Sequence, residues 1–217
     1  MWWTGAWIKT RLLCISVPLL TLFTKPQHLL SSGSCFLDIN PRGQFPAFKC
    51  GKYILNESFA ACFFLENEYK SQGTKLIPDS PDVQAQMYQR MFEVFTLGQK
   101  MVDVIYYNYL VPEGERHDSA IQRNKEALTA ELKLWEGYLK KTTLISSGDC
   151  CLAGKEFTLA DVLVFPVIAY MFRSGLSSER YPALGKYYNS LKDRPSIKAT
   201  WPPTWQGTPA QDTLKAI

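Results

Sequence analysis

Two adjacent residues, Glu57 and Ser58, combine side-chain types that can bind opposite charges at the start of a helix. They precede residues 59–69, where apolar side chains recur at helical spacing, so the sequence predicts a helix that begins at this pair. The backbone N–H and hydroxyl of Ser58 can then bind a carboxylate, because the positive end of the helix dipole favours an anion. The carboxylate of Glu57 can bind an ammonium group. Together with Asn56, these residues also suit a plain helix cap, and that alternative stays open.

Metal, disulfide and nucleic-acid chemistry are not indicated by the composition. The formal net charge is +4, and no run of basic residues is longer than Lys140-Lys141, which argues against a nucleic-acid surface. The two histidines, His28 and His117, are far apart, and no cysteine pair has C-x-x-C spacing, so we expect no metal site. We expect the six cysteines to be small apolar residues in a reducing compartment. They are Cys14, Cys35, Cys50, Cys62, Cys150 and Cys151.

The N-terminal region has the basic-then-apolar order of a signal peptide, with Lys9 and Arg11 before the apolar run 12–23. The run is too short for a transmembrane helix, and no small-x-small cleavage signal follows it promptly. We therefore expect a buried strand or a short helix here and a cytoplasmic protein. A secreted or membrane-anchored protein is the competing interpretation.

The rest of the chain reads as a hairpin and a helix followed by an all-helical region. Residues 45–49 and 53–55 are predicted to form two antiparallel strands, with Gly51 in the turn. The segment 78–81 contains two prolines and predicts a linker. Helical periodicity then predicts long helices over 83–109 and 121–139, a buried helix over 159–172, and shorter ones over 182–191 and 194–201. Thr158 and Asp161 form the capping-box pattern that starts the buried helix, and we assign them a structural role.

Several blocks of sequence, in this order along the chain, carry a family resemblance. They are Asn40-Pro41-Arg42-Gly43-Gln44, Asn56-Glu57-Ser58-Phe59-Ala60-Ala61-Cys62, Leu134-Trp135-Glu136-Gly137-Tyr138-Leu139, Phe157-Thr158-Leu159-Ala160-Asp161, and Lys192-Asp193-Arg194-Pro195-Ser196-Ile197-Lys198. From about residue 40 to 205 the chain resembles the cytosolic glutathione transferase superfamily. In the residues of these blocks the chain is similar to the rho class found in fish, and the theta class is more distant.

The resemblance implies the fold and the domain organisation. We expect an α/β thioredoxin-like N-terminal domain followed by an all-α helical-bundle C-terminal domain. The predicted boundaries are a divergent segment over 1–37, the remaining part of an incomplete glutathione-binding domain over 38–73, the helical domain over 82–205, and a tail over 206–217. The family also implies a homodimer.

The resemblance further implies a glutathione site made of Gln44, Phe45, Pro46, Glu57 and Ser58, with glutathione as co-substrate and no metal. Phe45, before a proline, is expected to pair its backbone with the cysteinyl backbone of glutathione, and Gln44 to reach the glycyl carboxylate. Glu57 and Ser58 are expected to hold the γ-glutamyl group. The twelve-residue step from Phe45 to Glu57 agrees with the spacing in the family.

The implied activity is that of an enzyme, a glutathione transferase that conjugates the glutathione thiolate to small hydrophobic electrophiles in detoxification. The residue that stabilises the thiolate is not identified. Ser16, in Ser16-Val17-Pro18, is a candidate, but only 24 positions separate it from Asn40, fewer than the ~30 residues of a βαβ unit. His28 lies near the position where members of this family often have a histidine that contacts glutathione, but the alignment of this region with the family is not fixed. The alternative is therefore a non-catalytic glutathione or hydrophobic-ligand binding protein that has lost the thiolate-activating loop.

The Met- and aromatic-rich helix predicted over 83–109 has two interpretations. Its large side chains either line a pocket for the electrophile or fill the core, and core is favoured for most of them. Some could instead face a partner subunit. The side chains in question are Met91, Phe95, Tyr106, Tyr107 and Tyr109.

Overall fold

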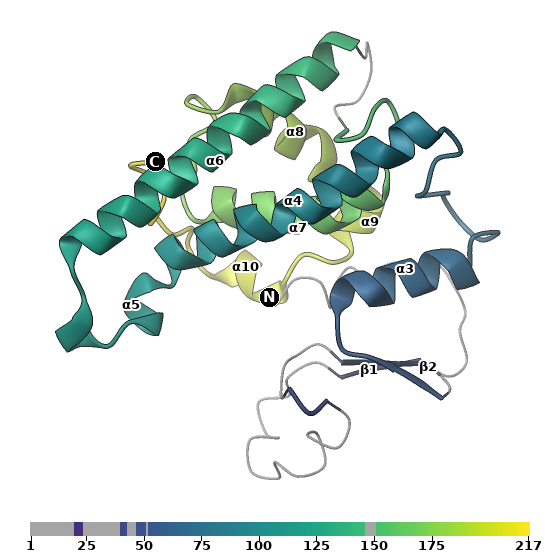
Figure 1. Ribbon diagram of the computed structural model, residues 1–217, viewed down its shortest axis with the longest axis horizontal. Coiled ribbons are helices and arrows are strands. Elements are labelled where there is room, and N and C mark those ends of the chain that lie inside the picture. Colours follow the sequence, from purple (N-terminus) through teal and green to yellow (C-terminus); the bar gives the residue numbers. More distant parts are fainter. Residues whose placement is uncertain (1–19, 24–39, 43–46, 51, 146–150) are drawn as a thin grey trace. The chain divides into compact units, whose positions relative to one another are not determined.

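The computed structural model describes residues 20–23, 40–42, 47–50, 52–145 and 151–217 (Figure 1). Its residues group into two compact units. The first unit lies within residues 1–76 and also takes in 195–202, and the second, which we call the helical unit, comprises 77–194 and 203–217.

The first unit contains a three-stranded antiparallel sheet in the order β1-β2-β3, formed by Leu20–Phe23, Ala47–Cys50 and Tyr53–Leu55. The predicted hairpin is confirmed in β2 and β3, where Phe48 pairs with Leu55 and Cys50 pairs with Tyr53. Of the N-terminal apolar run, residues 20–23 form a strand that pairs with β2, as in the strand alternative. The rest of that run lies outside the described residues.

Helix α3 (Ser58–Glu68) packs against the hairpin through one aromatic side chain. The ring of Phe64 lies 6.2 Å from that of Phe48 and 5.8 Å from that of Tyr53, measured between centroids. The sheet therefore fixes the direction of α3, and with it the position of the residues at its start.

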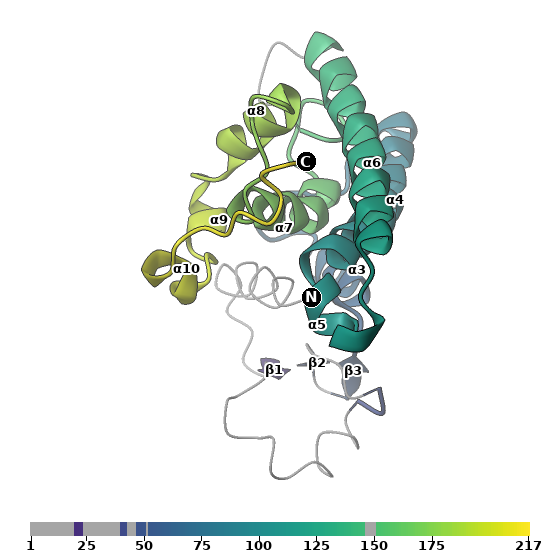
Figure 2. The ribbon, with the colours of Figure 1, turned by 90° about the vertical axis from the view of Figure 1, so that its left-hand side faces the viewer.

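The helical unit is built on two long helices that run side by side, α4 (Pro81–Ile105) and α6 (Asp118–Ile145), with α7 (Leu159–Arg173) packed against α4 (Figures 1 and 2). The short elements α5 (Tyr107–Leu110) and η2 (Glu113–Glu115) connect α4 to α6. Helix α8 (Pro182–Leu191) contacts both α6 and α7. The predicted periodicity is confirmed, because the apolar faces form the core. Its fully buried members include Met87, Met91, Leu97, Leu128, Leu132, Trp135, Leu139 and Phe165.

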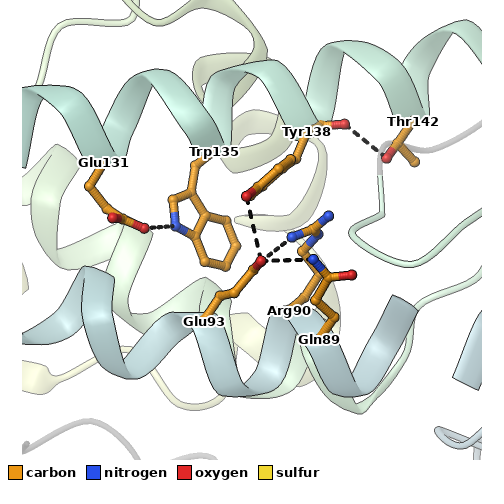
Figure 3. Close-up of polar contacts among 7 residues, drawn as sticks. All are labelled: Gln89, Arg90, Glu93, Glu131, Trp135, Tyr138 and Thr142. Carbon is orange, nitrogen blue, oxygen red and sulfur yellow. Dashed lines mark hydrogen bonds and ion pairs between the residues drawn. The ribbon is translucent and has the colours of Figure 1, made fainter. Parts of the chain in front are cut away.

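Polar contacts also join α4 to α6 (Figure 3). The carboxylate of Glu93 pairs with Arg90 and accepts hydrogen bonds from Gln89 Nε2 at 2.9 Å and from Tyr138 Oη at 3.4 Å. The guanidinium of Arg90 also lies over the Tyr138 ring, 3.6 Å from its centroid. On α6, Glu131 accepts a hydrogen bond from the buried Trp135 indole at 3.1 Å.

The capping box predicted at Thr158 is present at the start of α7. The Asp161 carboxylate accepts hydrogen bonds from the Thr158 backbone N–H at 2.8 Å and from the Thr158 hydroxyl at 3.1 Å. It also accepts one from the Leu152 N–H at 3.0 Å, which the sequence pattern did not predict. Burial raises the pKa of Asp161 to about 6, although these hydrogen bonds act in the opposite direction.

The C-terminal residues are packed more closely than their composition suggests. After α9 (Pro195–Lys198), which belongs to the first unit, the chain forms α10 (Pro203–Gly207), a helix that the sequence analysis missed. The backbone N–H of Leu214 then donates to Ser174 O at 2.8 Å, and the Leu214 side chain is fully buried. Gly175 permits this approach, because it has a φ of +96° and a Cβ there would lie 2.9 Å from Gln211 O.

Candidate functional site

The start of α3 has an unusual cap. Glu57 occupies the N-cap position with extended backbone angles, φ −113° and ψ 127°, and its carbonyl oxygen accepts the Ala61 N–H at 3.0 Å. The Glu57 side chain forms no capping hydrogen bond to the N–H groups of this helix. The Glu57 backbone thus occupies the cap position, whereas its carboxylate makes no capping hydrogen bond.

The Glu57 carboxylate instead pairs with Arg42, whose Nη1 lies 3.1 Å from Glu57 Oε1. Both side chains are largely exposed, at 72% for Arg42 and 60% for Glu57. Arg42 is positioned by Asn40, a fully buried residue whose Oδ1 accepts the Arg42 backbone N–H at 3.1 Å. The sequence analysis included Arg42 in a family block but assigned it no role, because a contact between residues fifteen positions apart leaves no periodic signal.

Ser58, the first residue of α3, is half-buried beside Glu57. The first N–H groups of a helix have no intrahelical acceptor, and the Glu57 side chain does not supply one here, so a helix start of this kind can accept an anion. On the other side of Glu57, the buried Asn56 Oδ1 has no hydrogen-bond partner within the described part of the chain. The arrangement therefore places anion-binding N–H groups next to a carboxylate that can bind a cation.

The other sequence-predicted site residues cannot be placed in this arrangement. Gln44, Phe45 and Pro46 lie outside the described residues, as do Ser16 and His28. In the structure, Glu57 and Ser58 lie together at the start of α3, and Arg42 forms an ion pair with Glu57. The contacts expected of residues 44–46 stay predictions.

The described residues contain neither a metal-binding cluster nor a membrane-spanning helix. Across 20–23, 40–42, 47–50, 52–145 and 151–217, no three His, Cys, Asp or Glu side chains are grouped so that they could hold a metal ion. No helix within those ranges has the length and apolar character needed to cross a membrane.

Comparisons with known proteins identify the family. Residues 97–195 match the model of the glutathione S-transferase C-terminal domain. Glutathione S-transferase A of Pleuronectes platessa is 61% identical over 196 residues, which are 90% of this chain and 84% of that protein. The chain belongs to the glutathione S-transferase family. The resemblance stated from sequence is thereby confirmed at the level of the superfamily, and the rho class stays a prediction.

Solved structures support the same family and its fold. A glutathione S-transferase from the Antarctic clam Laternula elliptica matches with a TM-score of 0.71 and 36% identity, covering 82% of this chain and 78% of its own. A glutathione transferase homologue from Sulfitobacter, solved with bound glutathione, matches with a TM-score of 0.61 and 22% identity over 76% of each chain. The predicted thioredoxin-like domain followed by a helical domain is the fold of this family, which confirms the fold class.

Family membership also confirms that the chain is an enzyme, a glutathione transferase, and does not favour the non-catalytic alternative.

The candidate pocket residues of α4 and α5 differ in their burial, although we expected most of them to lie in the core. Met91 and Tyr107 are buried in the core, whereas Phe95 and Tyr109 are exposed and Tyr106 is half-buried. Helical periodicity alone could not separate these cases, because it does not show which neighbours cover a face.

Proposed function

We propose that this glutathione transferase conjugates glutathione to small hydrophobic electrophiles and binds the γ-glutamyl group of glutathione at the start of α3. The observation that carries the proposal is the Glu57 carboxylate, which occupies a helix N-cap without capping the helix. Glu57 binds the ammonium of the γ-glutamyl group, while the N–H and hydroxyl of Ser58 bind its carboxylate. Gln44, Phe45 and Pro46 contact the rest of the tripeptide.

The ion pair with Arg42 is compatible with this role. An ion pair between exposed side chains stabilises a protein by about 0–1 kcal/mol, so exchanging the guanidinium for the ammonium of a ligand costs little. The ammonium and carboxylate of one γ-glutamyl group lie on the same carbon atom. Adjacent acceptor and donor groups, such as Glu57 and the start of α3, match that geometry.

The chemistry requires the thiolate of bound glutathione, because the thiolate and not the thiol is the nucleophile. A thiol of pKa near 8.5 is mostly protonated at neutral pH, and each unit of lowering corresponds to about 1.36 kcal/mol of thiolate stabilisation. Binding at α3 would position the nucleophile, and a hydrogen-bond donor would lower its pKa. Ser16 is the first residue to test as that donor.

The proposal is tested by isothermal titration with glutathione beside the conjugation rate of 1-chloro-2,4-dinitrobenzene. We expect Glu57→Gln and Ser58→Ala each to weaken glutathione binding by about 1–3 kcal/mol, the cost of leaving a ligand group unpaired. Glu68→Gln is the matched control, since it removes the same charge from the opposite end of α3. Wild-type affinity in both site variants would contradict the site, and binding without turnover would contradict the activity.

An aromatic cluster in the helical unit supports an apolar electrophile. The rings of Tyr106 and Tyr170 are stacked with centroids 6.3 Å apart, and their hydroxyls are hydrogen-bonded at 2.7 Å. Trp205 on α10 lies 6.1 Å from Tyr170 between centroids. We expect Trp205→Ala to raise KM for 1-chloro-2,4-dinitrobenzene with little change in glutathione affinity, and an unchanged KM would exclude this cluster as the electrophile site.

A homodimer is the assembly that we propose, with α4 in the interface. Phe92 and Phe95 lie on one face of α4, three residues apart, and are 62% and 53% exposed. Large apolar side chains together on a surface are typical of interaction sites. We expect light scattering to give twice the chain mass, and Phe92→Ser with Phe95→Ser to give a monomer. Tyr109→Ser, at a more exposed aromatic residue outside that face, is the control.

Detoxification in the cytoplasm is the setting we propose for this activity. Cell fractionation should recover the intact chain in the cytosolic fraction, and its recovery with membranes or in the medium would contradict this location.

A further inference from the structure

We propose that Arg42 determines part of the specificity for glutathione, because its guanidinium binds the α-carboxylate of the γ-glutamyl group. This inference rests on the glutathione site proposed at the start of α3 and adds one cation to that site. The observation that carries it is the ion pair between Arg42 and Glu57, which places the guanidinium next to the residue proposed to bind the γ-glutamyl ammonium.

The backbone of Arg42 is held independently of this ion pair. Its N–H donates at 3.1 Å to Oδ1 of Asn40, which is fully buried. A hydrogen bond from the backbone N–H to an asparagine side chain two residues earlier forms an Asx turn, and Pro41 restricts φ within it. The exposed guanidinium therefore extends from a backbone that a buried side chain fixes, which lowers the entropy that ligand binding costs.

The ion pair leaves polar groups of both side chains unused. Nη1 of Arg42 donates to Oε1 of Glu57 at 3.1 Å. A guanidinium has five N–H donors in a planar fork, and a carboxylate has two acceptor oxygens. Across the described residues, Nε and Nη2 of Arg42 and Oε2 of Glu57 form no hydrogen bond. The pair therefore presents N–H donors beside a carboxylate oxygen that can still accept.

The γ-glutamyl group carries charges that match this pair. Its ammonium and its α-carboxylate are bonded to the same carbon atom. When the ammonium binds Oε2 of Glu57, the α-carboxylate lies beside the guanidinium, so that positive and negative groups alternate around a ring. Glu57 then need not release Arg42. One carboxylate oxygen accepts the Ser58 N–H and the other accepts from Arg42, and hydrogen bonds between charged groups are the stronger kind.

Two other roles for Arg42 fit the structure less well. An ion pair between two largely exposed side chains adds little to stability, so a structural role does not account for it. The glycyl carboxylate is the second anionic group of glutathione, but it lies at the opposite end of the tripeptide. A guanidinium paired with Glu57 is at the γ-glutamyl end, and the α-carboxylate is the anion there.

The test is calorimetric titration of the full chain with three peptides. They are glutathione, 4-aminobutyryl-cysteinyl-glycine, which lacks only the α-carboxylate, and γ-glutamyl-cysteinyl-glycinamide, whose glycyl end is neutral. We expect Arg42→Gln to weaken binding of glutathione and of the glycinamide by about tenfold each, and of the 4-aminobutyryl peptide by less than about twofold. Arg42→Lys keeps the charge without the fork and should weaken glutathione binding by about threefold.

Lys49→Gln is the matched control. Lys49 is an exposed cation on β2, in the same unit as Arg42, and it should change glutathione affinity by less than about twofold. The thermal midpoint of each variant verifies that it is folded.

The outcomes separate this inference from the site on which it rests. Unchanged glutathione affinity in Arg42→Gln, beside a loss in Glu57→Gln, would overturn the role of Arg42 and leave the site at α3 in place. An equal loss for all three peptides would overturn it as well, because Arg42 would then act through Glu57 or through overall charge. A loss that is absent only for the glycinamide would move Arg42 to the glycyl carboxylate. Wild-type affinity in both Glu57→Gln and Ser58→Ala would contradict the site itself.

Discussion

The hydroxyl of Tyr187 on α8 donates a hydrogen bond to Asp161 Oδ1 at the start of α7, at 3.1 Å and across 26 positions of the sequence. The same oxygen accepts the Leu152 N–H, and the other carboxylate oxygen accepts the N–H and hydroxyl of Thr158. Asp161 is completely buried. The Asp161 carboxylate therefore caps the start of α7, binds the segment that precedes this helix, and joins α7 to α8.

Replacing Asp161 by asparagine should destabilise the protein strongly. The amide presents N–H groups where one carboxylate oxygen accepted hydrogen bonds, so buried donors lose their acceptor. We expect a loss of about 2–4 kcal/mol in the free energy of unfolding by urea. Tyr187→Phe removes a single donor and should cost about 1 kcal/mol. Equal losses in the two variants would contradict the central position of Asp161.

The pH dependence of stability provides a separate test of the same group. Burial raises the pKa of Asp161 from 3.8 to about 6 in the folded protein, so the folded state binds the proton more tightly than the unfolded state. The stability from this group is then fully present below pH 4 and is lost as the pH rises to about 6, a change of roughly 3 kcal/mol. We expect the advantage of wild type over Asp161→Asn to be larger at pH 4 than at pH 7. A larger advantage at pH 7 would show that the hydrogen bonds outweigh burial.

Glu136 should be the main determinant of the start of α8. Its carboxylate accepts the N–H groups of Ala183 and Leu184, which have no acceptor within their own helix. We expect Glu136→Ala to lower the free energy of unfolding by about 2–3 kcal/mol, and Glu136→Gln, which keeps one acceptor, by about 1 kcal/mol. Lys140→Gln should cost less than about 0.5 kcal/mol, because that lysine is mostly exposed.

The Arg42–Glu57 pair should contribute little to stability. Because both side chains are mostly in solvent, Arg42→Ala and Glu57→Gln should each change the free energy of unfolding by less than about 0.5 kcal/mol. Urea unfolding of each variant measures this change. If Glu57→Gln also loses glutathione affinity, the loss is then an effect on the site. A destabilisation above 2 kcal/mol would instead assign Glu57 a structural role.

The contact between Arg90 and Tyr138 should depend on the ring more than on the hydroxyl. The guanidinium lies 3.6 Å from the ring centroid, whereas the hydroxyl is 3.4 Å from Glu93, which is long for a hydrogen bond. We expect Tyr138→Phe to change stability by less than about 0.5 kcal/mol and Tyr138→Leu to cost about 1–2 kcal/mol. Thermal unfolding of the two variants compares them, and equal losses would assign the effect to the hydroxyl.

The predicted helices were mostly confirmed because their signals are local. The apolar faces that bury Met87, Leu128 and Trp135 follow from the spacing of these residues in the sequence, and the proline at 182 marks where α8 begins. The proline at 81, which we placed in the linker, is instead the first residue of α4. The missed helix α10 is only five residues long, too short for a period to be detected. The packing of Leu214 against the end of α7 was missed for a related reason, since it depends on a backbone contact with Ser174 forty residues earlier.

The sequence by itself determined the family, the two-part organisation and the helix start at Glu57-Ser58, because blocks of residues and helical periods are properties of neighbouring positions. Only the tertiary structure decided that the Glu57 carboxylate pairs with Arg42 and does not cap the helix. It also decided that the Glu136 carboxylate accepts the N–H groups at the start of α8. These contacts join residues from fifteen to almost fifty positions apart. Such pairs meet only after the chain has folded, when burial and hydrogen bonding select their partners.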